Sequence, residues 1–351
     1  MQWATGAVGR ESLRGILDHP DLELVGVKAY SDDKNGVDAG TIVDRAPVGV
    51  LATTDTDQVL DGDVDCVLYT PRTPSVDDVC RILSSGANVV TTAFAFHPAR
   101  ADPVDAKRML DACHAGGSSL HGTGLNPGNL GAVLPLAVAG MCREISQVTV
   151  QERADWSMYD SVDITFGQMM FGAEPSDVTP DAPSLRYTSE LFQQQVWLLA
   201  DALGAEIDEV TTDLEVIPAT TDRDIFGHPL KAGTVAGQRW RWSGRRAGQT
   251  VVEVETLWTV GERQPKHWPT PQHGWTISIE GTPSVQAHVM TLASFVRDVP
   301  IADHVQSASV ATAMQAVNAV PAVCTAAPGF VTMADIPFVW NRTSARTSPP
   351  V

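Results

Sequence analysis

The chain has 351 residues, with 42 acidic and 24 basic side chains, a formal net charge of −18 and a pI near 4.7. A chain of this length is longer than a domain built on one hydrophobic core usually is, so we expect two domains. The acidic balance excludes the broad basic surface that binding to nucleic acid or to an anionic membrane requires, so we expect a small-molecule substrate as the partner.

The cysteines and histidines argue against structural cross-links and metal sites. The five cysteines are scattered and form no CxxC pair, which favours a reducing compartment. The nine histidines show no ligand spacing with cysteine or aspartate, so no metal is predicted. No segment approaches the roughly 18 apolar residues of a membrane span, and no signal peptide is evident. We therefore expect a cytoplasmic protein.

The first 126 residues alternate apolar strands with amphipathic helices. Strands are expected at residues 1–4, 22–27, 48–51, 65–70, 88–92 and 118–120, and helices up to residue 18, from residue 75 and over 103–115. This pattern is typical of a parallel sheet covered on both faces, and right-handed crossovers then give an α/β, doubly wound Rossmann fold. The first strand is about half the usual length, which leaves open whether the natural start lies upstream of Met1.

The pattern changes after residue 145. A strand is expected at 145–151, a helix at 184–203, further strands at 213–217, 233–242, 250–260, 276–280 and 285–292, and an Ala- and Val-rich helix at 305–324. Alternating strands with glycine-rich turns predict an α+β domain with a mainly antiparallel sheet. We expect a dinucleotide-binding domain at 1–126, completed by a helix at about 302–326, a substrate and oligomerisation domain at 127–301, and a loose tail at 341–351.

Residues 4–9 (A-T-G-A-V-G) occupy the place of a G-x-G-x-x-G fingerprint, with Ala4 at its first position. Small residues are needed here because the pyrophosphate of a dinucleotide approaches bare backbone N–H groups at a helix N-terminus. A strand before, a helix after and a second strand about 20 residues on support binding of NAD(P)H over a simple structural turn.

The tip of the second strand should distinguish NAD from NADP. Ser31 and Lys34 favour a 2′-phosphate, whereas Asp32 and Asp33 favour a free ribose, and the sequence leaves this choice open. The residues expected to bind the cofactor are Thr5, Gly6, Ala7, Val8, Gly9, Ser31, Lys34, Thr70, Pro71, Thr92, Gly122, Thr123 and Asn126.

A second glycine-rich loop, residues 121–128 (H-G-T-G-L-N-P-G), follows the sixth strand. Asn126 is predicted to cap a helix that begins at Pro127. Such a helix N-terminus could hold a nicotinamide amide or a substrate carboxylate, and the alternative is an ordinary capped helix after a glycine turn.

Three segments together resemble a known family. They are residues 4–9, residues 122–128 (G-T-G-L-N-P-G) and residues 319–329 (A-V-P-A-V-C-T-A-A-P-G). In this order they resemble the dihydrodipicolinate reductase-like group, and within it the 2,4-diaminopentanoate dehydrogenases and native amine dehydrogenases, over residues 1–340. The resemblance implies a Rossmann domain, an α+β substrate domain, NAD(P)H, hydride transfer to a C=N or C=O carbon, and a homodimer.

Two departures from the family pattern bear on the chemistry. Dihydrodipicolinate reductases carry a His-rich, Lys-containing motif where residues 151–159 read Q-E-R-A-D-W-S-M-Y, so that activity is not expected. The diaminopentanoate and amine dehydrogenases resemble one another in a glutamate just after the fifth strand. Residues 92–98 (T-A-F-A-F-H-P) hold no carboxylate there, so an acid would have to come from elsewhere.

Hydride transfer needs a proton donor or an electrostatic partner near the reacting carbon. His97 is the first candidate, because it follows the fifth strand, and its alternative is a solvated loop histidine. Tyr159 could donate a phenolic proton, and Glu152 or Asp155 could supply the missing carboxylate. The expected substrate contacts, any of which could instead be core residues, are Phe94, Phe96, His121, Trp156 and Met158.

Three functions fit these observations. The first is an NAD(P)H-dependent oxidoreductase acting on a C=O or C=N carbon of a small, rather apolar substrate. The second is an amine dehydrogenase whose acid lies at a new position. The third is a sensor that binds NAD(P) without turnover, an alternative that the missing family glutamate keeps open, since a fold does not fix a function.

Overall fold

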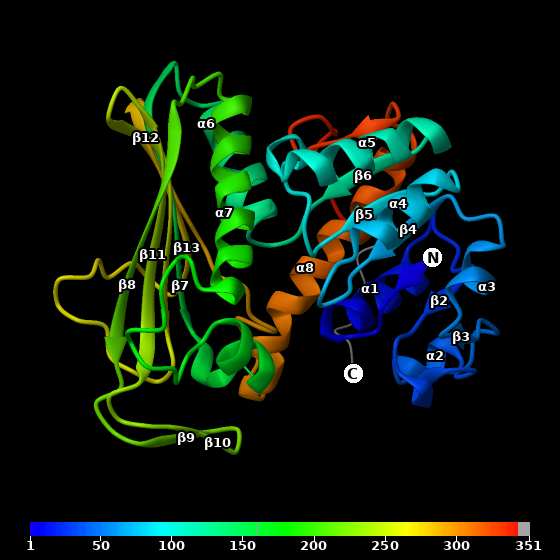
Figure 1. The fold of residues 1–351 in the computed structure, drawn as a ribbon, viewed down its shortest axis with the longest axis horizontal. Helices are drawn as coiled ribbons and strands as arrows, with labels where there is room; N and C mark the ends of the chain where they lie inside the picture. The colour runs from blue at the N-terminus through cyan, green and yellow to red at the C-terminus, as the bar shows by residue number, and fades with distance from the viewer. Residues whose placement is uncertain (160, 343–351) are drawn as a thin grey trace. The chain divides into compact units, whose positions relative to one another are not determined.

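The computed structural model describes residues 1–159 and 161–342, and its chain divides into two compact units. Unit 1 comprises Met1–Asn129 and Ala308–Val351, and unit 2 comprises Leu130–Ser307 (Figure 1). Most of the tail predicted to be loose, residues 343–351, lies outside the described residues.

Unit 1 is built on a seven-stranded parallel sheet with the order β15-β6-β5-β4-β1-β2-β3. The order 3-2-1-4-5-6 is that of a doubly wound dinucleotide-binding fold, so the predicted fold class is confirmed. The strands are β1 (Gln2–Trp3), β2 (Val27–Lys28), β3 (Ala52–Thr53), β4 (Cys66–Tyr69), β5 (Asn88–Thr91), β6 (Ser119–Gly122) and β15 (Gly329–Phe330).

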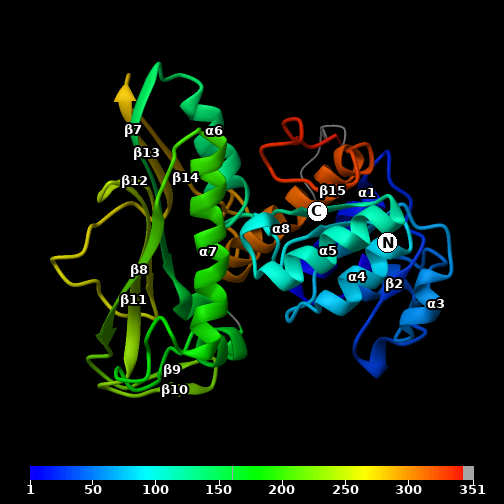
Figure 2. The same cartoon turned by 45° about the horizontal axis from the view of Figure 1, so that its top comes forward.

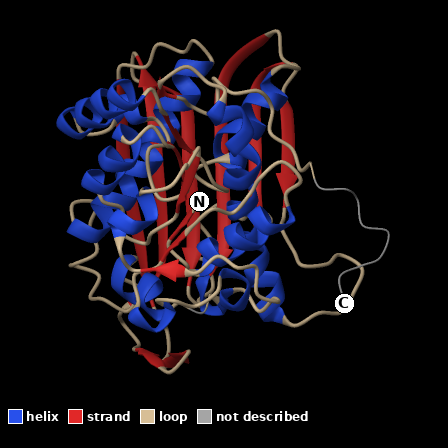
Figure 3. Cartoon of the chain, turned by 90° about the vertical axis from the view of Figure 1, so that its right-hand side faces the viewer, coloured by secondary structure: helices blue, strands red, loops and turns tan. Residues whose placement is uncertain are grey.

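Helices connect these strands, and local sequence signals fix several of their ends (Figure 3). The Ser75 side chain accepts a hydrogen bond from the backbone N–H of Asp78 at the start of α4, and Asp102 caps α5 in the same way. Gly117 ends α5 in the left-handed region, at φ 67°. The helices are α1 (Ala7–Asp18), α2 (Ala39–Ile42), α3 (Thr56–Leu60), α4 (Val76–Ser84), α5 (Pro103–Gly116) and the later turns of α8 (Ile301–Cys324).

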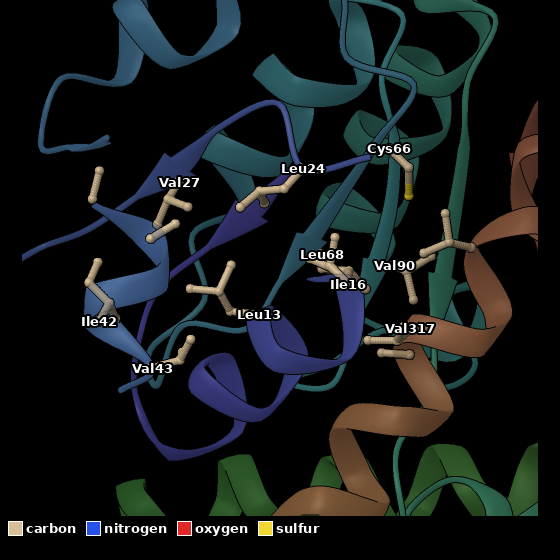
Figure 4. Packing of buried hydrophobic residues seen from close by; sticks show 14 of the residues in the cluster. Leu13, Ile16, Leu24, Val27, Ile42, Val43, Cys66, Leu68, Val90 and Val317 are labelled. Carbon is tan, nitrogen blue, oxygen red and sulfur yellow. The ribbon is translucent and has the colours of Figure 1, made fainter. Parts of the chain in front are cut away.

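The last long helix contributes to the hydrophobic core of unit 1. Val317 of α8 packs in one cluster with Leu13 and Ile16 of α1 and with Leu68 of β4 (Figure 4). A Cβ added at Gly15 would lie 2.9 Å from the Met314 sulfur, so glycine lets α1 and α8 approach closely. The C-terminal part of α8 is therefore an integral layer of the Rossmann unit.

Unit 2 holds a six-stranded mixed sheet with the order β14-β13-β7-β12-β11-β8. Only the β12–β7 pair is parallel, so the prediction of a mainly antiparallel sheet is confirmed. Helix α7 (Pro183–Ala202) runs along one face of this sheet, and α6 (Leu134–Ala139) packs there too (Figure 2). The strands are β7 (Glu144–Asp155), β8 (Glu209–Pro218), β11 (Val235–Arg246), β12 (Gln249–Thr259), β13 (Gly274–Thr282) and β14 (Val285–Val289).

The prediction of a helix that begins at Pro127 is wrong. A bridge joins Leu125 to Gly128, and Gly128 has a φ of 147°. A Cβ at Gly128 would lie 2.1 Å from the Gly124 carbonyl oxygen, so the loop folds back on itself as a tight turn. Helical structure starts only at η3 (Asn129–Val133), a π-helix that leads into α6. Asn126 therefore lies in a turn and caps no helix at Pro127.

Within the described ranges, no helix combines the length and apolar character that a membrane span requires. The same residues contain no group of three or more His, Cys, Asp or Glu side chains that could hold a metal ion.

Candidate functional site

The N-terminus of α1 is arranged to receive an anion. The helix follows Gly6, which provides no side-chain cap, and its first turn contains no acidic residue. The first helical hydrogen bond runs from Arg10 N to Gly6 O, at 2.9 Å, so the preceding N–H groups have no acceptor within the helix. Gly6 and Ala7 are exposed. Free N–H groups and the positive end of the helix dipole together favour a phosphate at this position.

The glycines of this loop differ in what surrounds them. A Cβ at Gly6 would meet nothing within 4 Å, whereas a Cβ at Gly9 would lie 2.3 Å from the Ala4 carbonyl oxygen. Gly6 therefore leaves open space above the backbone, and Gly9 allows α1 to pack on β1. Ala4 adopts a φ of 76°, which explains why the fingerprint usually has glycine at this position.

A residue that the sequence analysis did not single out holds the loop in place. The Gln2 side-chain amide donates to the Ala4 carbonyl oxygen and to Thr70 Oγ1, at 2.8 Å each. Gln2 is completely buried, so these bonds are shielded from water. They fix the turn after β1 to the carboxyl end of β4, where Thr70 and Pro71 begin the next loop.

The segment after β2 brings a cation to the same loop. Lys34, in the short helix η1 (Asp32–Lys34), donates from Nζ to Thr5 O at 3.2 Å and to Thr5 Oγ1 at 3.1 Å. The first residues beyond β2 are Ala29, Tyr30 and Ser31, none of which is acidic. The Tyr30 hydroxyl accepts a hydrogen bond from Trp3 Nε1 at 3.0 Å.

The carboxyl ends of β5 and β6 meet beside each other. The Thr123 N–H donates to the Thr91 carbonyl oxygen at 2.9 Å, and a Cβ at Gly122 would lie 2.2 Å from the Ala95 carbonyl oxygen. Thr92 begins the loop that packs there. In a doubly wound sheet the carboxyl ends form the ligand-binding edge, and the order of strands reverses between β1 and β4. Unit 1 thus brings Thr92, Gly122 and Thr123 to the same edge of the sheet as the glycine loop.

The loop after β5 is less exposed than its sequence suggests. Phe94 and His97 are each 9% exposed, and Phe96 is 2% exposed. The Phe94 ring packs edge-on against Tyr69, with ring centroids 6.3 Å apart. His97 immediately precedes the short helix η2 (Pro98–Arg100). His97 is therefore a buried side chain and not a solvated loop histidine.

His121 lies in the interior of unit 1. It is fully buried, and its Nδ1 is 2.8 Å from the Val331 carbonyl oxygen. Burial lowers the pKa of His121 to about 4, so the ring is neutral near pH 7. The structure thus gives His121 the alternative role, that of a hydrogen-bonded core residue, and we do not assign it to the substrate.

The buried imidazole should make the protein sensitive to acid. The unfolded chain binds a proton near pH 6.5, but the folded chain does so only near pH 4, so the free energy of unfolding falls as the pH drops through this window. Lowering the pH from about 7 to about 5 should cost about 2 kcal/mol. Urea unfolding of the wild type and of His121→Asn at both pH values tests this. An equal loss in the variant would show that other groups cause it.

Unit 2 presents a carboxylate held by two tryptophans. Glu152 lies on β7, between β12 and β13. Trp258 Nε1 donates to its Oε1 at 3.0 Å, and Trp275 Nε1 donates to its Oε2 at 3.1 Å. Side chains alternate along a strand, so Glu152 shares a face with the buried Val148 and Val150. This is the face that α6 covers.

Trp258 connects this carboxylate to an aromatic cluster. Its ring lies 5.5 Å from that of Trp156, which in turn lies 5.3 Å from Tyr159 and 6.2 Å from Phe171. Trp156, Tyr159 and Glu152 are each only partly buried. A fixed carboxylate beside aromatic rings attracts a cation that carries an apolar group. Met158, in the short helix η4 (Trp156–Met158) next to this cluster, is 40% exposed.

Asp155, the other candidate carboxylate, binds backbone N–H groups of two turns. Its Oδ1 accepts hydrogen bonds from Ser157 N and from Gly261 N, at 2.9 Å each. The first bond caps η4, and the second holds the turn after β12. Asp155 therefore supports the backbone of two turns, whereas Glu152 accepts hydrogen bonds from the side chains of Trp258 and Trp275.

Comparisons with known proteins agree with this architecture. The model of the 2,4-diaminopentanoate dehydrogenase C-terminal domain matches residues 132–345. An amine dehydrogenase of Streptomyces virginiae is 31% identical over 307 residues, which cover 82% of this chain and 83% of that protein. A 2,4-diaminopentanoate dehydrogenase of Acetoanaerobium sticklandii is 24% identical over 348 residues, covering 95% of this chain and 85% of that protein.

Among solved structures, an amine dehydrogenase from Mycobacterium smegmatis has the same fold. It superposes with a TM-score of 0.75 at 20% sequence identity, over 98% of this chain and 97% of the other.

Proposed function

Since the chain belongs to the 2,4-diaminopentanoate dehydrogenase family of NAD(P)-dependent oxidoreductases, we propose that it is an amine dehydrogenase that interconverts a primary amine with a carbonyl compound and ammonia. The observation that carries this proposal is the Glu152 carboxylate, whose two oxygens accept hydrogen bonds from Trp258 and Trp275. It supplies the acid that the loop after β5 lacks. Because Glu152 is a candidate acid, the glutamate missing after β5 no longer favours a sensor that binds NAD(P) without turnover.

Glu152 would act on the amine nitrogen. Its carboxylate binds the substrate ammonium and takes up one proton, which leaves the neutral amine that can lose a hydride. The glycine loop of unit 1 would hold NAD(P)⁺, which would supply the acceptor for the hydride. Water then adds to the iminium carbon and loses one proton to the solvent. Glu152 returns its proton to the nitrogen, and the carbonyl forms as ammonia leaves and takes up the remaining hydroxyl proton.

The aromatic cluster indicates the class of amine. Trp156, Tyr159 and Phe171 offer apolar surface near the carboxylate, through Trp258. Such surface favours an amine with an aliphatic or aromatic chain over a diamino acid, whose second ammonium and carboxylate would each have to be desolvated. We therefore propose an apolar monoamine as the substrate, with Trp156 and Tyr159 in contact with its chain.

The cofactor would be NADP(H). The residues just beyond β2, where NAD-specific folds place an acidic side chain for the ribose 2′-hydroxyl, are Ala29, Tyr30 and Ser31. Lys34 brings an ammonium group to the adjacent Thr5. A cation with a nearby hydroxyl suits a 2′-phosphate.

Replacing Lys34 with Ala should therefore lower kcat/KM for NADPH by about 10-fold and for NADH by at most about twofold. Steady-state kinetics with both cofactors measure this. Lys107→Ala provides the control, because Lys107 is an exposed lysine of the same unit that pairs with Asp111. An equal loss with both cofactors would place Lys34 at the pyrophosphate and contradict the assignment.

The activity itself is tested with matched substrates in the oxidative direction. Purified protein is incubated with NADP⁺ or NAD⁺ and a series of alkyl amines, together with the alcohols of the same chains, and formation of the reduced nicotinamide is followed. We expect turnover of amines and none of alcohols. Turnover of alcohols alone would identify a carbonyl reductase, with His97 as its proton donor, and would overturn the proposal.

A further inference from the structure

Two cysteines far apart in the sequence meet in unit 1. Cys66 begins β4, and Cys324 is the last residue of α8. Each thiol is the largest influence on the pKa of the other, because the two side chains are neighbours. The Cys324 sulfur also lies 4.0 Å from the carbonyl oxygen of Asp65, the residue just before Cys66. Figure 4 shows Cys66 at the edge of the cluster that contains Val317 of α8.

The two thiols differ in the way that disulfide exchange requires. Cys324 is exposed, whereas Cys66 is buried. The neighbouring Cys66 thiol lowers the pKa of Cys324, whereas the Cys324 thiol together with burial raises the pKa of Cys66. The accessible sulfur is therefore the better nucleophile, and the hidden one is placed to attack it afterwards.

We propose that Cys66 and Cys324 form a reversible disulfide site that ties the end of α8 to the start of β4. The oxidant is a low-molecular-weight disulfide, such as oxidised glutathione. The Cys324 thiolate attacks one of its sulfurs, which gives a mixed disulfide and releases one small thiolate. Cys66 then attacks the Cys324 sulfur and releases the second. Two protein thiols are oxidised, the small disulfide is reduced to two thiols, and the two protein protons pass to them.

The site lies away from the cofactor loops. Cys66 is at the amino end of β4, whereas Thr70 and the glycine loop lie at the carboxyl ends of the strands. Oxidation should therefore leave cofactor affinity unchanged within about twofold. A cross-link between residues so distant in sequence restricts the unfolded chain, so the oxidised protein should melt at a Tm higher by about 5 °C.

The test uses the full chain, first reduced and then equilibrated with oxidised glutathione. Intact mass and peptide mapping should show one intramolecular Cys66–Cys324 bond in the wild type and in the control Cys80→Ser, whose thiol lies half-buried in the same unit. Cys66→Ser should accumulate a glutathione adduct on Cys324. Cys324→Ser, a change at an exposed position, should form no bond at Cys66 and show no rise in Tm.

Two results would overturn the proposal. One is a wild-type protein that keeps glutathione on Cys324 without forming the internal bond. The other is an internal bond that maps to another pair of cysteines. Neither result depends on the catalytic activity, so a failure here is separate from a failure of the amine dehydrogenase assignment.

Discussion

Replacing Glu152 with Gln should lower kcat/KM for amine oxidation by about 10³-fold, the scale of losing a general acid–base group. Gln keeps the shape of the side chain but cannot take up a proton, and it removes the negative charge that binds the substrate ammonium. Its amide nitrogen would also face an indole N–H, since Trp258 and Trp275 both donate to this side chain. Steady-state kinetics with the preferred alkyl amine measure the loss, and thermal melting verifies that the variant is folded.

Asp155→Asn is the matched control for this experiment. Asp155 lies three residues on and also carries a carboxylate, but its Oδ1 caps η4 and binds Gly261 N. Its replacement should lower the free energy of unfolding by about 1 kcal/mol, the usual cost of a weakened cap, with kcat/KM within about threefold of the wild type. A large kinetic loss in Asp155→Asn together with near-normal kinetics in Glu152→Gln would show that Asp155 is the acid.

Adding a methyl group at Gly9 should lower the stability of unit 1 more than the same change at Gly6. At Gly9 the new Cβ would lie 2.3 Å from the Ala4 carbonyl oxygen, so α1 must move away from β1. We expect Gly9→Ala to lower the free energy of unfolding by about 2 kcal/mol and to raise the Kd for NADPH at least about 10-fold. At Gly6 the Cβ meets open space, so Gly6→Ala should fold normally.

The Kd of Gly6→Ala distinguishes packing from cofactor contact. If the pyrophosphate approaches the backbone at Gly6, a methyl group there should raise the Kd for NADPH about 10-fold while the Tm stays the same. Gly62→Ala is the control for adding a methyl group outside the cofactor loop, because a Cβ at Gly62 also meets nothing within 4 Å. Fluorescence titration and thermal melting of all three variants provide the comparison. Unchanged affinity in Gly6→Ala would exclude this loop as the pyrophosphate site.

The Rossmann unit could be predicted well from the sequence, because its signals are local. The apolar segment at 65–70 contains β4, and Ser75 and Asp102 cap their helices as such residues do in isolation. The short edge strands could not be placed as well. Of the strand expected at 22–27 only Val27 pairs, in β2, and β3 lies just beyond the strand expected at 48–51. Pairing depends on neighbours that lie far away in the sequence.

The candidate site was harder to predict for the same physical reason. Glu152 was one of two carboxylates proposed from the sequence, and nothing local separates it from Asp155. Its hydrogen-bond partners lie 106 and 123 residues further along the chain, on the two strands that flank β7. Likewise, the side chain that fixes the glycine loop, Gln2, reaches Thr70 across 68 residues. Such contacts appear only once strand order and register are known.

The most direct test of the central claim follows oxidation of NADPH in the reductive direction, with one aliphatic ketone or aldehyde, in the presence and absence of ammonium. If Glu152 serves an amine nitrogen, the wild type oxidises NADPH only when ammonium is present, and the product is the primary amine. Equal rates with and without ammonium, with an alcohol as product, would contradict the claim and identify a carbonyl reductase.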